Sequence, residues 1–409
     1  MNNHEVKWFH CFMRGIPPLI SGAGTFINLL DALLINGFGQ TTVVSATAQN
    51  GVVTLDISNS ETFEKYSIIN IAGDDQLKGD HRVIESANNY IKIALDIPNQ
   101  VFTGTFYVKY APLGWNKVPG TGPANTALYT PKVSYSDFML YINDTHTQTC
   151  QVKICRGASN LSNISDFNTL IDFVPKITST SSPFTVWVKS NSSNKTTYFL
   201  IGDGATFYHH TGNFSTASFN RNTLREGAMI GCGEINRYLQ DDILSPFIVT
   251  LHTGSNQLNN IGSNFYNRTL NYLESAYIDT SKVATDMTFL GNVKGEPGND
   301  VLYPVADGPL CSKHSGSNTH KVDWSVKNQG LELIKILATS NTTARGEFPG
   351  MYAIPYDFGN TDDLLIMEGS GELENRLILF KTTNCVNTSY NNKNGPLGVL
   401  AFDITGPWR

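Results

Sequence analysis

The sequence predicts a mainly β protein, with a small β-sandwich or barrel module, a larger β-rich region and a short N-terminal amphipathic helix. Charged residues make up only 16% of the 409 residues, compared with about 25% in ordinary soluble proteins. Polarity comes instead from Asn, Ser and Thr, which favour turns and strand surfaces over helix interiors. The 35 Gly and 17 Pro residues add frequent chain reversals. Together these observations are typical of a chain with many short strands.

Residues 1–39 are expected to form an N-terminal arm, with an extended piece at residues 6–12 followed by a helix. In that helix, apolar side chains follow the i, i+3, i+4, i+7, i+8 spacing that places one stripe along a helix face. The stripe consists of Phe26, Leu29, Leu30, Leu33 and Leu34. Thr25 is positioned to cap the first turn, and Asn36-Gly37 supplies a left-handed stop.

Residues 40–112 are predicted to form one compact β module. Asn50-Gly51 lies between two strand-like runs, and this pair is a strong signal for a β-hairpin. Asn88-Asn89 plays the same part later in the module. About six short strands at this spacing predict a small sandwich or barrel. The clearest runs are residues 41–47, 52–57, 81–86, 90–95 and 105–110.

Residues 113–409 are predicted to form a larger β-rich region, with two subdomains that divide near residue 300. The region begins with a loop-like stretch, which Trp115 is suited to pin across a core. Hairpin turns are expected at residues 143–144, 191–194 and 202–204. Later expectations are long loops over residues 230–300 with a short helix near 269–276, a strand or helix at 331–338, and strands at 376–382 and 397–404.

Three motifs occur in order along the chain: SGAG followed by LDALLINGFG at residues 21–39, APLGW at 111–115, and FDITGPWR at 402–409. This combination resembles a family of uncharacterised virion structural proteins of tailed bacteriophages and prophages, and the resemblance spans nearly the whole chain. It implies a non-enzymatic virion component present in multiple copies, at a head-decoration, neck or collar, or tail or baseplate position. The motifs are structural, and no catalytic residues come with them.

The resemblance also implies partners, namely other virion proteins and copies of the same chain, on a particle whose proteins are made in the host bacterial cytoplasm. The candidate subunit-contact residues are Phe26, Leu29, Leu30, Leu33, Leu34 and Trp408. The alternative for the helix stripe is packing on the chain's own β domains. Trp408 lies where most chains fray, so its ring is expected to be buried in its own fold or against a neighbour.

Charge and patterning argue against several classes of partner. The net charge is −6 and there is no run of Lys and Arg, which argues against nucleic-acid binding. The chain shows neither a signal-peptide layout nor 18 consecutive apolar residues, so no membrane span is expected. The six cysteines lack CxxC spacing and are expected to be free, mostly buried thiols. No cofactor is expected.

Several residues have a chemical interpretation beside a structural one. His209-His210, with Asp203 nearby, offers metal ligands, but adjacent strand residues point to opposite faces, so no metal site is expected. Asp241-Asp242 and Asp362-Asp363 are candidates for a glycosidase pair, although adjacent acids in such surroundings are typical of turns. Residues 21–24 precede a helix as anion-binding loops do. They lack the Lys of a phosphate loop, so a tight packing turn is expected.

Two alternative functions stay open from the sequence: a receptor- or glycan-binding adhesin on the same particle, and, less favoured, a polysaccharide depolymerase. Depolymerases usually contain a long repeated β-helix, and fibre-type receptor-binding proteins usually contain repetitive shafts. The sequence has no such internal repeat. It also lacks GxSxG, HExxH and catalytic Cys/His patterns. A non-enzymatic protein is therefore expected.

Overall fold

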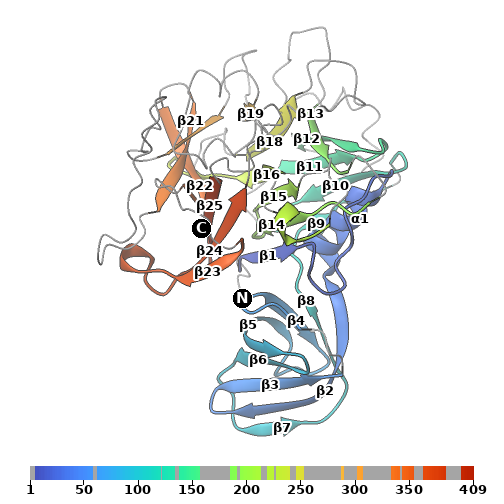
Figure 1. The fold of residues 1–409 in the computed structure, drawn as a ribbon, viewed down its shortest axis with the longest axis vertical. Coiled ribbons are helices and arrows are strands. Elements are labelled where there is room, and N and C mark those ends of the chain that lie inside the picture. Colours follow the sequence, from blue (N-terminus) through green and yellow to red (C-terminus); the bar gives the residue numbers. More distant parts are fainter. Residues whose placement is uncertain are drawn as a thin grey trace.

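The computed structural model describes most of the chain in fifteen segments. They are residues 5–58, 62–120, 122–133, 138–156, 185–190, 194–212, 219–224, 227–239, 246–252, 287–289, 302–306, 333–340, 343–353, 363–383 and 398–409. The fold is mainly β, as predicted, and helical segments make up 8% of it. The strands form three sheets, which we call the barrel sheet, the large sheet and the C-terminal sheet (Figure 1). No helix of the described part is long and apolar enough to span a membrane.

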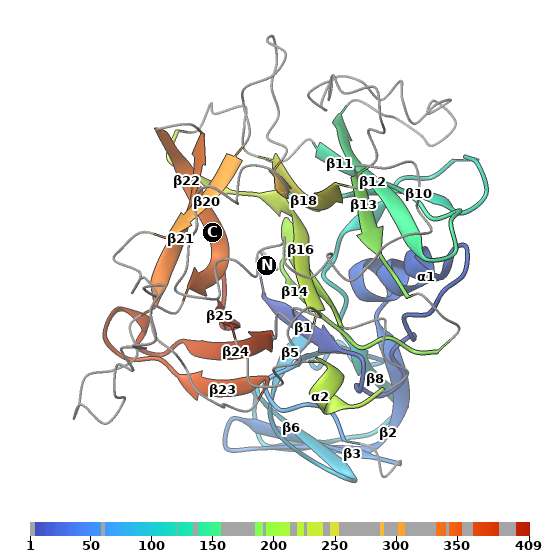
Figure 2. The ribbon, with the colours of Figure 1, turned by 45° about the horizontal axis from the view of Figure 1, so that its top comes forward.

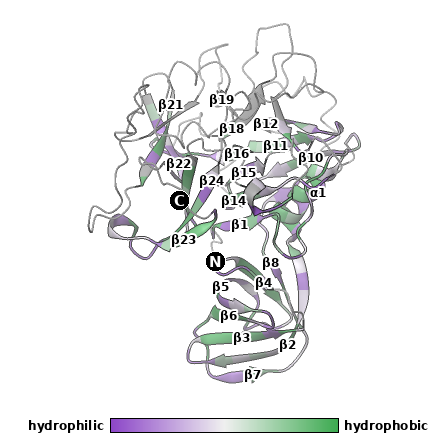
Figure 3. Cartoon of the chain, in the orientation of Figure 1, coloured by the Kyte–Doolittle hydropathy of each residue, from purple (hydrophilic) through white to green (hydrophobic). Residues whose placement is uncertain are grey.

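The barrel sheet closes on itself because its first and last strands in spatial order pair with each other. Its strands in order are β3 (Val52–Ile57), β6 (Tyr90–Ala94), β5 (Gly79–Ala87), β4 (Ile68–Ala72), β8 (Phe106–Tyr110) and β2 (Phe38–Gln49), with β7 (Gln100–Phe102) added to β2. Buried and exposed residues alternate along β3, as the pleat of a strand with one core face requires. Figure 3 shows apolar residues in green along β3, β4 and β6.

Turn chemistry explains how the barrel strands are joined. Asn50 and Gly51 form the β2–β3 turn with φ values of 53° and 76°, which confirms the predicted hairpin. Asn88 and Asn89 also form the predicted two-residue turn, between β5 and β6. Neither of these two residues has a positive φ, so the backbone geometry of this turn differs from that of Asn50-Gly51.

The large sheet has ten strands in one path and an eleventh at its side. The path is β1 (Lys7–His10), β14 (Tyr198–Gly202), β15 (Thr206–Gly212), β16 (Gly227–Glu234), β18 (Pro246–His252), β13 (Thr185–Val188), β12 (Thr149–Arg156), β11 (Phe138–Asn143), β10 (Thr126–Thr130) and β9 (Asn116–Lys117), with β19 (Met287–Phe289) on β18. The predicted hairpins β11–β12 and β14–β15 are confirmed.

The hairpin expected around residues 191–194 was wrong. β13 pairs with β12 and β18, whereas β14 pairs with β1 and β15, so these two neighbours in sequence do not pair with each other. Every described residue of β14 is buried. A strand of this kind has no polar face to indicate its partner, and the pairing is decided by distant segments.

The C-terminal sheet follows the order β20 (Leu302–Ala306), β21 (Ile334–Ser340), β22 (Thr343–Ala353), β25 (Gly398–Asp403), β24 (Leu377–Thr383) and β23 (Leu365–Glu368), with β17 (Asn236–Arg237) on β22. Within the ambiguous segment at residues 331–338, residues 334–338 are strand, and the strands predicted at 376–382 and 397–404 are confirmed as β24 and β25. Two short helices, α2 (Arg221–Leu224) and η5 (Gly371–Leu373), lie between strands. The helix expected near 269–276 lies outside the described residues.

The described part of the N-terminal segment is joined to the body formed by the large and C-terminal sheets. β1 is an edge strand of the large sheet. α1 (Thr25–Leu30) continues as one π-helical segment, η1 (Asp31–Asn36), which contacts β9 of the same sheet; Figure 2 shows α1 at the side of the body. Gly37 ends this helix at the predicted position with a positive φ of 71°, but its ψ of 176° lies outside the left-handed helical conformation. In this structure the segment therefore belongs to the body and does not stand apart as an arm.

The barrel is connected to the body at one place and held there by polar contacts. Phe38 at its start pairs with Tyr110 at its end. Lys7 Nζ lies 2.6 Å from Asp80 Oδ2, in a pair that is almost fully buried. Arg82 Nη2 donates to the Thr405 carbonyl at 3.2 Å. These contacts tie the barrel to both β1 and the C-terminal segment.

Candidate functional site

The turn before α1 is filled by a side chain from a distant loop. Backbone N–H groups of Phe26 and Ile27 donate to Asp144 Oδ2 at 2.8 and 3.2 Å. Lys189 Nζ lies 2.5 Å from Asp144 Oδ1, and both side chains are fully buried. Burial raises the pKa of Asp144, while Lys189 opposes that shift. The anion position at this helix start is thus occupied by the chain's own carboxylate.

The cap expected from Thr25 was wrong. Its hydroxyl donates instead to the carbonyls of Ile20 and Gly22, at 2.9 and 2.8 Å. A donor to a carbonyl closes the preceding turn, but it does not satisfy the N–H groups that open the helix. Asp144 satisfies them. The expectation of a tight packing turn at residues 21–24 agrees with this arrangement.

The helix stripe packs inside its own chain. Its five candidate contact residues are each 0% exposed: Phe26, Leu29, Leu30, Leu33 and Leu34. The Phe26 ring lies edge-on to Trp187 and to His209, with centroid distances of 5.9 and 5.5 Å. The alternative that the sequence left open, packing on the chain's own β domains, is what the structure shows. These side chains are not surface groups.

The second motif is bound to the end of that helix. The N–H groups of Gly114 and Trp115 donate to the Leu34 carbonyl at 2.9 and 3.0 Å. The Trp115 indole is buried between the rings of Phe138 and Phe207. Its Nε1 donates to the Asp203 carbonyl at 3.0 Å. Trp115 therefore does pin this stretch across a core, as the sequence predicts.

The third motif, residues 402–409, also contacts the turn at Asp203. Arg409 Nη1 lies 2.7 Å from Asp203 Oδ2, and Arg409 Nη2 lies 2.5 Å from Thr206 Oγ1. The Asp203 carbonyl thus accepts a hydrogen bond from the Trp115 indole, and the Asp203 carboxylate pairs with Arg409. We call Leu34, Trp115, Asp203 and Arg409 the motif junction. Through it, the helix, the barrel exit and the C-terminal segment are all attached to the β14–β15 turn.

Trp408 is buried in its own fold and is only 6% exposed. Its Nε1 donates to the Asp403 carbonyl at 2.7 Å. The ring lies over Gly350, where any Cβ would overlap the indole and where the φ of 64° already disfavours other residues. Of the two fates that the sequence left open for this ring, burial within the chain is the one observed.

The His209-His210 pair is also buried, and both residues are 0% exposed. Burial lowers the pKa of His209 to about 3. Burial, followed by the Lys381 ammonium, lowers the pKa of His210 well below its ordinary value. Over the described residues, no three His, Cys, Asp or Glu side chains form a group suited to a metal ion. Both imidazoles are therefore neutral core groups.

The acidic pairs and cysteines are only partly described. Asp363 accepts from the Lys381 ammonium at 3.1 Å, whereas Asp241, Asp242 and Asp362 lie outside the described residues. Three cysteines are free and buried: Cys11, Cys150 and Cys232. Burial raises the pKa of the Cys11 thiol to about 12, so it is not a reactive thiolate.

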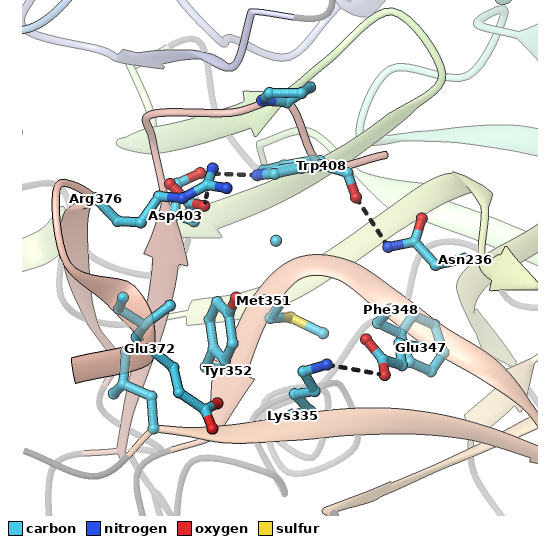
Figure 4. Close-up of a pocket in the computed structure, with 14 residues that line it drawn as sticks. Asn236, Lys335, Glu347, Phe348, Met351, Tyr352, Glu372, Arg376, Asp403 and Trp408 are labelled. Carbon is cyan, nitrogen blue, oxygen red and sulfur yellow. Dashed lines mark hydrogen bonds and ion pairs between the residues drawn. The ribbon is translucent and has the colours of Figure 1, made fainter. Parts of the chain in front are cut away.

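A polar pocket of about 450 Å³ opens between the C-terminal sheet and the C-terminal segment (Figure 4). It is lined by Asn236, Leu333, Lys335, Glu347, Phe348, Gly350, Met351, Tyr352, Glu372, Leu373, Arg376, Asp403, Pro407 and Trp408. Figure 4 shows Arg376 and Asp403 on one side, Lys335 and Glu347 on another, and Tyr352 near Glu372 on a third.

Sequence reasoning had singled out Trp408 among these lining residues but not the pocket itself. The other polar residues come from β17, β21, β22, η5, the residue before β24 and the end of β25, so no local spacing unites them. Comparison with models of known protein families gives no match to this chain, and comparison with curated protein sequences gives none either.

Proposed function

We propose that this chain is a non-enzymatic structural component of a tailed-phage virion, present in multiple copies at a head-decoration, neck or collar, or tail or baseplate position. The resemblance of its three motifs to phage virion proteins suggests this role. The observation that carries the proposal is that the motif residues hold parts of the chain's own fold together. Trp115 and Arg409 are both bonded to the turn at Asp203, and the Trp115 and Trp408 rings are buried in the chain's own fold.

Motifs shared by an enzyme family usually place reactive groups where a substrate can reach them. Here the Trp115 indole and the Arg409 guanidinium are both engaged by the turn at Asp203. These bonds attach the barrel exit and the C-terminal sheet to the large sheet. A protein that works by shape and by contacts with neighbours needs its parts fixed in this way.

Contacts with other virion proteins would use surfaces other than the helix stripe. The barrel carries exposed apolar side chains on the outer face of β2, β7 and β8: Val44 at 65%, Val101 at 67% and Tyr107 at 42% exposed. A stable interface buries more than about 1,000 Å² in total. We propose that this face of the barrel forms a subunit contact.

Quantitative mass spectrometry of gradient-purified particles tests the proposal. We expect the chain at a fixed copy number that matches a symmetry of the head or tail. Val44→Lys should lower that copy number, whereas Glu368→Lys, an exposed change on β23 of the C-terminal sheet, should not. Absence of the chain from purified particles contradicts the virion role. Cleavage of bacterial surface polysaccharide by the purified protein contradicts the non-enzymatic role.

A further inference from the structure

The polar pocket contains hydrogen-bonding groups that the chain itself does not use. Within the described part of the chain, the Tyr352 hydroxyl and the Glu372 carboxylate have no hydrogen-bond partner. Burial, with the Asp403 carboxylate as a second cause, raises the pKa of Tyr352. Its hydroxyl therefore stays protonated at neutral pH and can both donate and accept.

The cations of the pocket are already matched by carboxylates. Lys335 Nζ lies 3.1 Å from Glu347 Oε1, and Arg376 Nη1 lies 3.2 Å from Asp403 Oδ2. Glu372 has no ion-pair partner among the described residues. The charge of each cation is offset by its carboxylate partner, and the Glu372 carboxylate would repel an anionic ligand. A phosphate, sulfate or carboxylate group is thus a poor match for this pocket.

The pocket also offers aromatic surface beside these polar groups. Part of the half-buried Tyr352 ring packs on the small apolar cluster around Phe380, and the residue also lines the pocket. Tyr238, which is 51% exposed, donates its hydroxyl to Glu347 Oε1 at 3.3 Å and so stands next to the same wall. Aromatic faces match the C–H surface of a sugar ring, while carboxylates and guanidinium groups match its hydroxyls.

We propose that this pocket binds a neutral saccharide unit. Tyr352 provides the stacking surface, Glu372 accepts hydrogen bonds from sugar hydroxyls, and Arg376 donates through the N–H groups not bound to Asp403 and to the Gly406 carbonyl. A volume of about 450 Å³ falls within the range of small-ligand sites. The inference goes beyond the structural role and does not depend on it. It gives a location to the glycan-binding activity that the sequence left open.

The test uses the full-length protein and saturation-transfer difference NMR with defined probes. The neutral probes are the methyl glycosides of glucose, galactose, rhamnose and N-acetylglucosamine, and the charged probes are glucuronic acid and glucosamine. We expect at least one neutral probe to bind. Glucuronic acid should bind at least about tenfold more weakly, because a like charge near Glu372 opposes it.

Variants assign the binding to this pocket. Tyr352→Ala and Glu372→Gln should each weaken binding of the neutral probe about tenfold, the usual size of one lost charged hydrogen bond or stacking contact. Tyr352→Phe keeps the ring and should weaken it less than Tyr352→Ala. Glu374→Gln is the matched control, because Glu374 is exposed on the same turn but does not line the pocket. It should leave binding unchanged.

Three results would overturn the proposal. The first is that no neutral probe binds. The second is that binding survives unchanged in Tyr352→Ala and Glu372→Gln proteins that melt at the wild-type temperature. The third is a preference for glucuronic acid or glucosamine over every neutral probe. If Tyr352→Ala fails to fold, Glu372→Gln decides alone, because Glu372 is an exposed residue on a turn.

Discussion

Acidification should destabilise the folded chain through the buried His209-His210 pair. Burial keeps a core histidine neutral in the folded chain. In the unfolded chain the same imidazole binds a proton with a pKa of about 6.5. The pKa of His209 in the folded chain is about 3. Its contribution to stability is therefore complete above pH 6.5 and is lost as the pH falls from 6.5 toward 3.

The magnitude follows from the gap between the two pKa values. Each pH unit below 6.5 favours the unfolded state by about 1.4 kcal/mol per buried neutral histidine. At pH 5.0, which is 1.5 units below, His209 alone should lower the free energy of unfolding by about 2 kcal/mol relative to pH 7.5. His210 acts in the same direction, because its pKa is also lowered by burial.

The assay compares urea unfolding at pH 7.5 and pH 5.0, followed by tryptophan fluorescence and circular dichroism. Trp187 reports on this region, because it contacts Phe26 and Phe26 contacts His209. His209→Phe should lose about 2 kcal/mol less than wild type between the two pH values. Tyr198→Phe is the control: its buried ring lies beside His209, and it removes no group that titrates in this range.

A constant change in stability caused by repacking cancels in this comparison, because each protein is measured against itself at pH 7.5. The reasoning is refuted if His209→Phe and wild type lose the same stability on acidification. That result would mean that His209 is protonated in the folded chain or exposed to solvent.

Three further predictions concern single residues, each measured by its urea midpoint. Gly51→Val should destabilise the barrel by about 1 kcal/mol, because a β-branched residue resists the φ of 76°; an unchanged midpoint would contradict this turn. Gly350→Ala should cost about 2 kcal/mol by displacing the Trp408 ring, and unchanged tryptophan fluorescence would argue against that contact. Asp144→Asn should cost about 3 kcal/mol, because it leaves the Lys189 ammonium buried without its charge partner; a smaller effect than for an exposed acid would refute the pairing.

Local signals predicted much of this fold. The Asn50-Gly51 turn and the alternating strands of the barrel depend on a few neighbouring residues, so the sequence alone was sufficient. The cap of α1 was not predictable in that way, because Asp144 lies more than a hundred residues from Phe26. The same holds for the partner of β14, which is buried on both faces and carries no pattern that indicates its neighbours.

The polar pocket could not be predicted from local sequence patterns, for a similar reason. Tyr352, Glu372 and Arg376 are ordinary strand and turn residues when read one at a time. They line a pocket only because their segments meet, and long-range strand pairing in the C-terminal sheet brings those segments together. The C-terminal motif did contain a signal, since an aromatic residue in a terminal segment predicts burial. That signal identified Trp408, which lines one side of the pocket, but not the polar residues that line the rest of it.

The pairing of Phe38 with Tyr110 has an evolutionary consequence. The chain leaves the body and returns to it at almost the same point, so the barrel is an inserted cassette whose loss or replacement would not reorder the strands of the large sheet. Recombination could exchange such a cassette for another without redesigning the scaffold. Without the barrel, Lys7 would lose its Asp80 partner and the Thr405 carbonyl would lose the Arg82 donor. A new insert would therefore need to supply a carboxylate at the first position and a hydrogen-bond donor at the second.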